Sequence, residues 1–140
     1  MTRLAASVVL IDDQGRILLV HEDYGKRRWG LPGGRHEPGE STEETAIREA
    51  KEETNLDVEL GELIGEYHMV SAVGEDLLDV SVFAATIVGG ELRPQDGEID
   101  DIGWFDANRL PHPMTDSAPP AIADAVRGAR GVHRRLVSTR

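Results

Sequence analysis

The sequence predicts a small α/β domain, an α/β/α sandwich in which a mixed β-sheet lies between helices. Three observations support this class. A chain of 140 residues suits one domain with a single core. Apolar, β-branched runs alternate with two segments of helical character, an order typical of a sheet covered by helices. We see no internal repeat or linker, and we therefore expect residues 1–140 to form one domain.

Two strands are expected near the N-terminus. Residues 4–11 are apolar and β-branched towards their end, and residues 16–21 form a second apolar run. The turn-forming residues 12–15 lie between them, which favours a hairpin. A signal peptide is the alternative, but the turn follows a short apolar run at once. No stretch approaches the roughly 18 apolar residues that a membrane helix needs.

The best-defined element is a helix over residues 42–54. Ser41 is a favourable N-cap residue, and Glu44 three positions later completes a capping box. Asn55 favours the left-handed conformation that closes a helix. The helix follows a polar loop at residues 22–28 and the glycine turn at residues 30–34.

The two sides of this helix differ in character. One arc, which we expect to pack on the sheet, contains Ala46, Ile47, Ala50 and Thr54. The other arc contains Thr45, Glu49, Glu52 and Glu53. Like charges three and four positions apart cost roughly 0.2 to 0.5 kcal/mol per pair, and Arg48 and Lys51 do not neutralise all three. A hard divalent cation would offset the repulsion; a solvated acidic face is the alternative.

Further strands are expected after the helix. Residues 56–70 alternate in part, and Gly61 and Gly65 suggest a bend or bulge. Residues 77–88 are the most strand-like segment and are assigned as a central strand. Residues 102–105 form a short strand after an acidic loop at residues 91–101.

A second helix is expected to close the domain over residues 117–129. Its apolar face contains Ile122, Ala125, Val126 and Ala129. The tail from Gly131 is basic, and we expect it to fray. Its basic residues include Arg134, Arg135 and Arg140.

Composition excludes several classes of protein. The net charge of -11 disfavours a binder of nucleic-acid duplexes, which uses basic residues for phosphate contacts. The chain has no cysteine, so disulfides and thiolate zinc sites are excluded, and a cytoplasmic location is expected. An anionic phosphate ligand would be repelled unless metal ions mediate.

The residues from Gly34 to Leu56 resemble the Nudix box, G-x5-E-x7-R-E-U-x-E-E-x-G-U, where U is apolar. The matching positions are Gly34, Glu40, Arg48, Glu49, Ala50, Glu52, Glu53 and Leu56. Asn55 departs from the pattern, since the family has glycine there. The preceding W-x-L-P-G-G at residues 29–34 also resembles this family, the Nudix hydrolases (MutT-like).

The resemblance implies the Nudix fold and a pyrophosphohydrolase, an enzyme acting on phosphorus-containing acid anhydrides. It would use Mg2+, with Mn2+ as a substitute, to hydrolyse a nucleoside diphosphate linked to another moiety. The implied catalytic set is Glu49, Glu52, Glu53 and Arg48, with Arg48 orienting the carboxylates. The implied metal ligands are Gly33, through its carbonyl, Glu49, Glu52, Glu53 and Glu98. Glu49 is a ligand or the general base, and Asp100 and Asp101 are rivals to Glu98.

The implied partner is a small-molecule nucleotide, a nucleoside triphosphate by default. Arg28 and Arg35 are candidates for binding its phosphates, with a solvated loop as the alternative. Trp29 is a candidate for stacking on the base, although packing in the core is the interpretation we favour. The alternative function is a catalytically silent Nudix-fold module that senses or binds a nucleotide. No duplex or membrane partner is expected, and a homodimer is left open.

Overall fold

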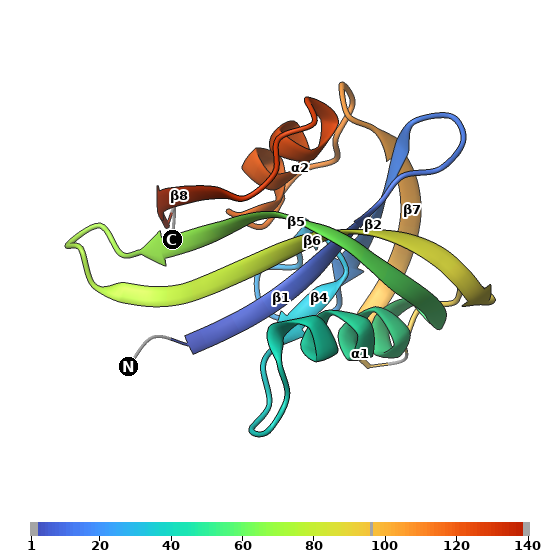
Figure 1. Ribbon diagram of the computed structural model, residues 1–140, viewed down its shortest axis with the longest axis horizontal. Coiled ribbons are helices and arrows are strands. Elements are labelled where there is room, and N and C mark those ends of the chain that lie inside the picture. Colours follow the sequence, from blue (N-terminus) through green and yellow to red (C-terminus); the bar gives the residue numbers. More distant parts are fainter. Residues whose placement is uncertain (1–2, 96, 139–140) are drawn as a thin grey trace.

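The computed structural model describes residues 3–95 and 97–138, and its main element is a five-stranded mixed sheet (Figure 1). The strands follow the order β4-β1-β6-β5-β8. They are β1 (Arg3–Leu10), β4 (Gly33–Arg35), β5 (Leu56–Val70), β6 (Asp76–Gly90) and β8 (Val132–Val137). A second, antiparallel sheet has the order β3-β2-β7. Its strands are β2 (Arg16–Glu22), β3 (Trp29–Gly30) and β7 (Ile99–Asp106).

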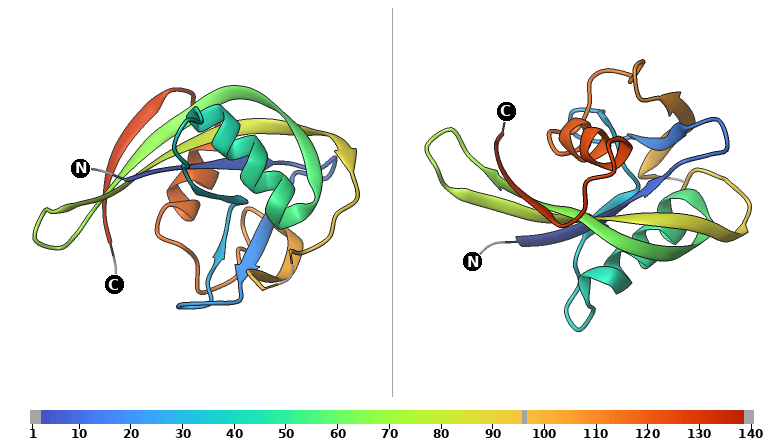
Figure 2. Two further views of the ribbon diagram at one scale, coloured as in Figure 1. Left: turned by 90° about the horizontal axis from the view of Figure 1, so that it is seen from below. Right: turned by 45° about the horizontal axis from the view of Figure 1, so that its top comes forward.

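The two helices, α1 (Thr42–Thr54) and α2 (Ala118–Val126), lie on opposite faces of the large sheet (Figures 1 and 2). Successive residues of β1 point to opposite faces, so this strand contributes to two cores. The core under α1 includes Ala6, Val8, Leu10, Ala46 and Ala50. The core under α2 includes Ala5, Val9, Tyr67, Ala121 and Ile122. The predicted α/β/α sandwich is therefore confirmed, with a second small sheet added to it.

The predicted N-terminal hairpin is wrong in its pairing. Both strands and the turn form, but β1 and β2 belong to different sheets and share only the bridge between Ile11 and Ile17. Instead, β1 pairs in parallel with β6 along its whole length, and β2 pairs with β7. Each strand therefore pairs with a segment from a distant part of the chain, and local turn residues cannot reveal such a partner.

The predicted boundaries of α1 are confirmed, including both caps. Ser41 and Glu44 form the reciprocal capping box, and Asn55 has a left-handed φ of 64°. The buried arc differs from the prediction, because Thr45 and Glu53 are buried while Ile47 is 42% exposed. The reason is that β4 lies against the acidic side of α1 and covers it. Val126 of α2 is likewise 55% exposed, contrary to the predicted apolar face.

The predicted bend in residues 56–70 is confirmed, since the pairing of β5 with β6 shifts register around Leu63 and again before Gly65. The central position of β6 is also confirmed. The expectation of a frayed tail is wrong, because β8 pairs in parallel with β5 from Gly65 to Val70. Arg140 lies outside the described residues. No helix in the described ranges is long and apolar enough to span a membrane.

A buried carboxylate explains why the tail is ordered. Asp124 of α2 is 2% exposed. Its carboxylate accepts hydrogen bonds from the Tyr67 hydroxyl at 2.7 Å and from Arg134 Nε at 2.7 Å, and Arg127 also donates to it. These bonds join α2, β5 and β8. Hydrogen bonds from Arg134 hold the pKa of Asp124 well below its usual range.

We expect Asp124→Asn to lower the free energy of unfolding by about 2 to 3 kcal/mol at pH 7, because two arginines lose their shared anion. The folded-state pKa of Asp124 is depressed, so its contribution is present above the unfolded pKa of about 3.9 and is lost as the pH falls below it. Urea unfolding at pH 7 and pH 3 measures this. An equal difference between the two proteins at both pH values would contradict the assignment.

Candidate active site

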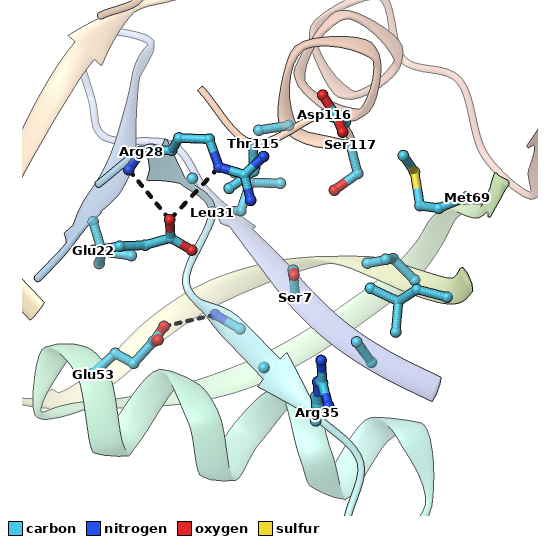
Figure 3. A pocket seen from close by; sticks show the side chains of 18 of the residues that line it. Ser7, Glu22, Arg28, Leu31, Arg35, Glu53, Met69, Thr115, Asp116 and Ser117 are labelled. Carbon is cyan, nitrogen blue, oxygen red and sulfur yellow. Dashed lines mark hydrogen bonds and ion pairs between the residues drawn. The ribbon is translucent and has the colours of Figure 1, made fainter. Parts of the chain in front are cut away.

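A cavity of about 350 Å³ lies between the two sheets and is bounded by the end of α1 and the segment before α2 (Figure 3). One part of its wall is polar and charged, with Glu22, Arg28, Arg35 and Glu53. Another part is apolar, with Met69, Leu77, Leu78 and Val80. The two parts suit a ligand that carries both an anionic group and an apolar ring.

Glu53 reaches the cavity from the last turn of α1. Its Oε1 accepts a hydrogen bond from the backbone N–H of Gly33 at 2.8 Å (Figure 3). The residue is only 6% exposed. Gly33 must be glycine here, because an added Cβ would lie 2.7 Å from Ser7 Cα and 2.4 Å from the Ala6 carbonyl oxygen. The close contact between β4 and β1 thus brings a backbone donor to the buried carboxylate.

Glu49 lies one turn earlier on α1, against the next glycine. A Cβ added at Gly34 would lie 2.0 Å from Glu49 Oε2. The carboxylate therefore occupies the space that any larger residue at position 34 would need. Gly33 is therefore required by its close approach to backbone, whereas a larger residue in place of Gly34 would displace the Glu49 side chain.

Arg48 links the acidic side chains of this region. Its Nε and Nη2 donate to the two carboxylate oxygens of Glu40 at 2.9 and 2.8 Å. Its Nη1 donates to Glu49 at 2.7 Å and to Glu52 at 3.1 Å. The bonds from Arg48 lower the pKa of Glu40 to about 2. The guanidinium group is therefore placed to orient these carboxylates rather than to face the cavity, and its role in the reaction stays a prediction.

The buried carboxylate of Glu53 and the partly buried carboxylate of Glu49 are both hard to ionise as they stand. Burial raises the pKa of Glu53 to about 8, the Gly33 amide opposes the shift, and the neighbouring charges of Glu49, Glu98 and Glu22 add to it. Burial also raises the pKa of Glu49 above its usual range, although its bond to Arg48 opposes this. A cation beside these groups would favour their charged forms.

The structure separates the three candidate acids of the loop before β7. The charge of Glu98 acts on Glu53, and burial together with Glu22, Glu53 and Glu98 raises the pKa of Tyr24. Glu98 therefore acts on Glu53 through its charge, although it is not among the described residues of the cavity wall. Asp100 instead bonds to Nδ1 of His21 at 2.6 Å, and Asp101 accepts from the backbone N–H next to it.

The predicted phosphate-binding and stacking residues lie in different places. Arg28 and Arg35 both line the cavity, and Arg28 Nε has no hydrogen-bond partner although it is buried. Trp29 instead packs between His21 and Phe105, with ring centroids 5.0 and 4.9 Å away. It is absent from the described cavity wall. This position supports packing rather than base stacking for Trp29.

Several residues of the cavity wall were missed from the sequence. Glu22 falls in the predicted polar loop, yet it ends β2 and accepts a hydrogen bond from the backbone N–H of Arg28 at 3.2 Å. Ser7 lies in a strand without any motif, and the segment at residues 115–118 precedes α2. The alternation of β1 and β2 could have shown which side chains share a face, but not that the face borders a cavity.

The chain matches known proteins over most of its length. A family model described as the NUDIX domain matches residues 1–125. The chain belongs to the Nudix family. It is therefore a Nudix hydrolase, and Nudix hydrolases generally use divalent metal ions.

Named Nudix relatives act on different substrates. A protein of Bacillus subtilis (strain 168), provisionally named an 8-oxo-dGTP diphosphatase, is 36% identical over 132 residues, which are 91% of this chain and 83% of that protein. A Methanocaldococcus jannaschii ADP-ribose pyrophosphatase is 35% identical over 104 residues, 73% of this chain and 61% of that protein. The crystal structure of a MutT NUDIX hydrolase from Burkholderia pseudomallei has a TM-score of 0.79 at 29% identity, covering 89% of this chain and 98% of that one.

We expect Gly34→Ala to reduce hydrolase turnover by on the order of tenfold to a hundredfold while the Nudix fold stays intact. The added methyl group meets the end of a flexible side chain, so the Glu49 carboxylate moves and the backbone does not. Turnover and thermal unfolding should be measured together. Gly61→Ala is the matched control, because its Cβ would meet nothing closer than 3.5 Å. Normal turnover in Gly34→Ala would contradict the role of this contact.

Proposed function

We propose that this Nudix hydrolase is a Mg2+-dependent pyrophosphohydrolase of a nucleoside triphosphate or related nucleotide, with Mn2+ as a substitute. The observation that carries the proposal is the buried carboxylate of Glu53 at the cavity, held by the Gly33 amide 2.8 Å away. Among the described residues, the Glu53 carboxylate accepts a hydrogen bond from the Gly33 amide and has several acidic neighbours. A divalent cation and the phosphates it carries would complete its environment.

The donor set fits a hard divalent ion. Glu49, Glu52, Glu53 and the Gly33 carbonyl would supply oxygen ligands, and Glu98 is near enough to act on Glu53 electrostatically. In the parts of the chain that the structure describes, no three acidic or histidine side chains already form a complete metal cluster. Mg2+ does not require one, because it keeps several waters and binds through one or two carboxylates together with substrate phosphates.

The chemistry follows from these positions. The bound ion would neutralise charge on the pyrophosphate and lower the pKa of water, which attacks phosphorus. Arg28 and Arg35 would contact phosphate oxygens from the cavity wall. Glu49 or Glu98 would accept the proton of the attacking water. Glu98 is preferred among the loop acids, because Asp100 is held by His21.

The substrate class rests on the cavity and the relatives. Met69 and the apolar wall beside it suit a base, and the names of the Bacillus subtilis and Methanocaldococcus jannaschii relatives both specify nucleotide derivatives. A silent sensing module would not need buried carboxylates that repel one another. A single domain over residues 1–140, a cytoplasmic location and homodimer formation stay predictions.

We expect Glu53→Gln to lower turnover by on the order of a hundredfold, because an amide replaces the anion that would hold the metal. A panel of nucleoside triphosphates and ADP-ribose should be assayed with Mg2+ and with Mn2+ for phosphate, pyrophosphate and nucleoside monophosphate, because hydrolysis of the ADP-ribose pyrophosphate yields two phosphomonoesters and no free phosphate. Glu43→Gln is the matched control, since Glu43 lies exposed on the first turn of the same helix. Near-normal turnover of Glu53→Gln would reject the assignment.

We also expect Mg2+ to raise the midpoint of thermal unfolding of the substrate-free protein by a few degrees. A ligand at ten times its dissociation constant stabilises a protein by about 1.4 kcal/mol. The shift should disappear in the double variant Glu49→Gln/Glu53→Gln. An identical shift in the double variant would place the ion elsewhere on this acidic chain.

A further inference from the structure

A buried threonine lies next to the acidic groups of α1. Thr45 is 0% exposed, and its side chain faces Glu40 in the loop before the helix. Thr45 Oγ1 lies 2.8 Å from Glu40 Oε1 and 3.0 Å from the backbone carbonyl of Ser41. Residue 45 is one of the unconstrained positions of the Nudix box, so the family pattern does not account for this threonine.

The single hydroxyl proton of Thr45 can be donated to only one of these two acceptors at a time. The carbonyl of Ser41 already accepts the backbone N–H of Thr45 at 3.0 Å, as the first bond of the helix. The carboxylate of Glu40 is charged and the shorter contact, and hydrogen bonds to charged acceptors are about twice as strong as neutral ones. The hydroxyl therefore donates to Glu40.

Glu40 is the anchor of the guanidinium group that orients the helix carboxylates. Its Oε1 accepts from Thr45, from Arg48 Nη2 at 2.8 Å and from the Glu37 backbone N–H at 2.9 Å. The same Arg48 donates from Nη1 to Glu49 and Glu52. Hydrogen bonds thus run without a break from the buried hydroxyl, through Glu40 and Arg48, to the carboxylates of Glu49 and Glu52.

We propose that Thr45 is a positioning residue of this enzyme: its hydroxyl fixes the Glu40 carboxylate, which fixes Arg48 and, through it, the carboxylates of Glu49 and Glu52. The proposal rests on the proposed function, because these carboxylates are its metal ligands. Groups that orient ligands commonly contribute tenfold to a hundredfold to metal affinity. Two residues, Glu40 and Arg48, lie between Thr45 and the ligands. The effect of Thr45 should therefore be smaller, about fivefold to tenfold.

The test compares three variants with the wild type. Thr45→Val removes the hydroxyl and keeps the branched shape, whereas Thr45→Ser keeps the hydroxyl and removes a methyl group. Thr54→Val is the matched control. Thr54 is also 0% exposed on α1, and its hydroxyl donates to the Ala50 carbonyl rather than to a carboxylate. Loss of this hydroxyl should cost stability without disturbing Glu40.

Mn2+ affinity of the substrate-free protein should be measured by titration calorimetry, beside urea unfolding and the Mg2+ dependence of turnover. We expect Thr45→Val to weaken Mn2+ binding by about fivefold to tenfold and to raise the half-saturating Mg2+ concentration similarly. Thr45→Ser and Thr54→Val should stay within about twofold of the wild type. Wild-type Mn2+ affinity in Thr45→Val, or equal weakening in Thr54→Val, would overturn the proposal.

The wild-type protein separates this proposal from the proposed function. If the wild type binds Mn2+ and hydrolyses a nucleotide while Thr45→Val behaves identically, only the role of Thr45 fails. If the wild type neither binds the ion nor turns over any nucleotide of the panel, the proposed function fails, and the role of Thr45 fails with it.

Discussion

The contact between the Glu53 carboxylate and the Gly33 amide is the constraint on which the site depends. It joins the last turn of α1 to β4, which is itself paired with β1, so one hydrogen bond ties the helix to the edge of the large sheet. Burying a carboxylate is unfavourable unless it is paired and hydrogen-bonded, and one amide donor does not compensate the charge. The raised pKa of Glu53 results mainly from this unfavourable burial of its charged form.

The packing of the rest of α1 determines how the free-energy cost of burying the Glu53 carboxylate is offset. The helix turns its small residues, Ala46 and Ala50, to the sheet, which lets the backbones approach closely. Its acidic side then faces the glycines of β4, where Glu49 fills the space above Gly34. Among the described residues, Arg48 donates hydrogen bonds to Glu40, Glu49 and Glu52 but not to Glu53. The helix therefore concentrates its uncompensated charge at the cavity.

Features set by neighbouring residues were predictable from the sequence. The capping box at Ser41, the left-handed Asn55 and the bend in β5 each depend on local backbone preferences, and the structure has all three. The spacing of the box likewise fixes which glutamates share a side of α1. The exposure of Ile47 was not predictable, because it depends on where β4 lies against the helix.

Features set by distant partners were not predictable. The pairing of β1 with β6 and of β8 with β5 joins segments far apart in sequence, and no turn residue records such a choice. The position of Glu22 depends on the same kind of contact, since β2 brings it to a cavity whose other walls come from later segments. From its sequence alone, the basic tail is predicted to be solvated. Its order depends on the buried Asp124, which accepts a hydrogen bond from Arg134.

The charges around the cavity determine how an anionic substrate can enter. Among the described residues of its wall, Arg28 and Arg35 are basic, whereas Glu22, Glu53 and Asp116 are acidic. Arg28 lies 3.7 Å from Glu22, so part of its charge is already balanced. Arg48 is turned towards Glu40 and the outer face of α1. On a chain with a net charge of -11, two arginines cannot balance both the acidic wall and a polyphosphate. Under the proposed function, divalent ions that enter with the phosphates would supply the missing charge, and the buried carboxylate of Glu53 would give those ions a fixed position.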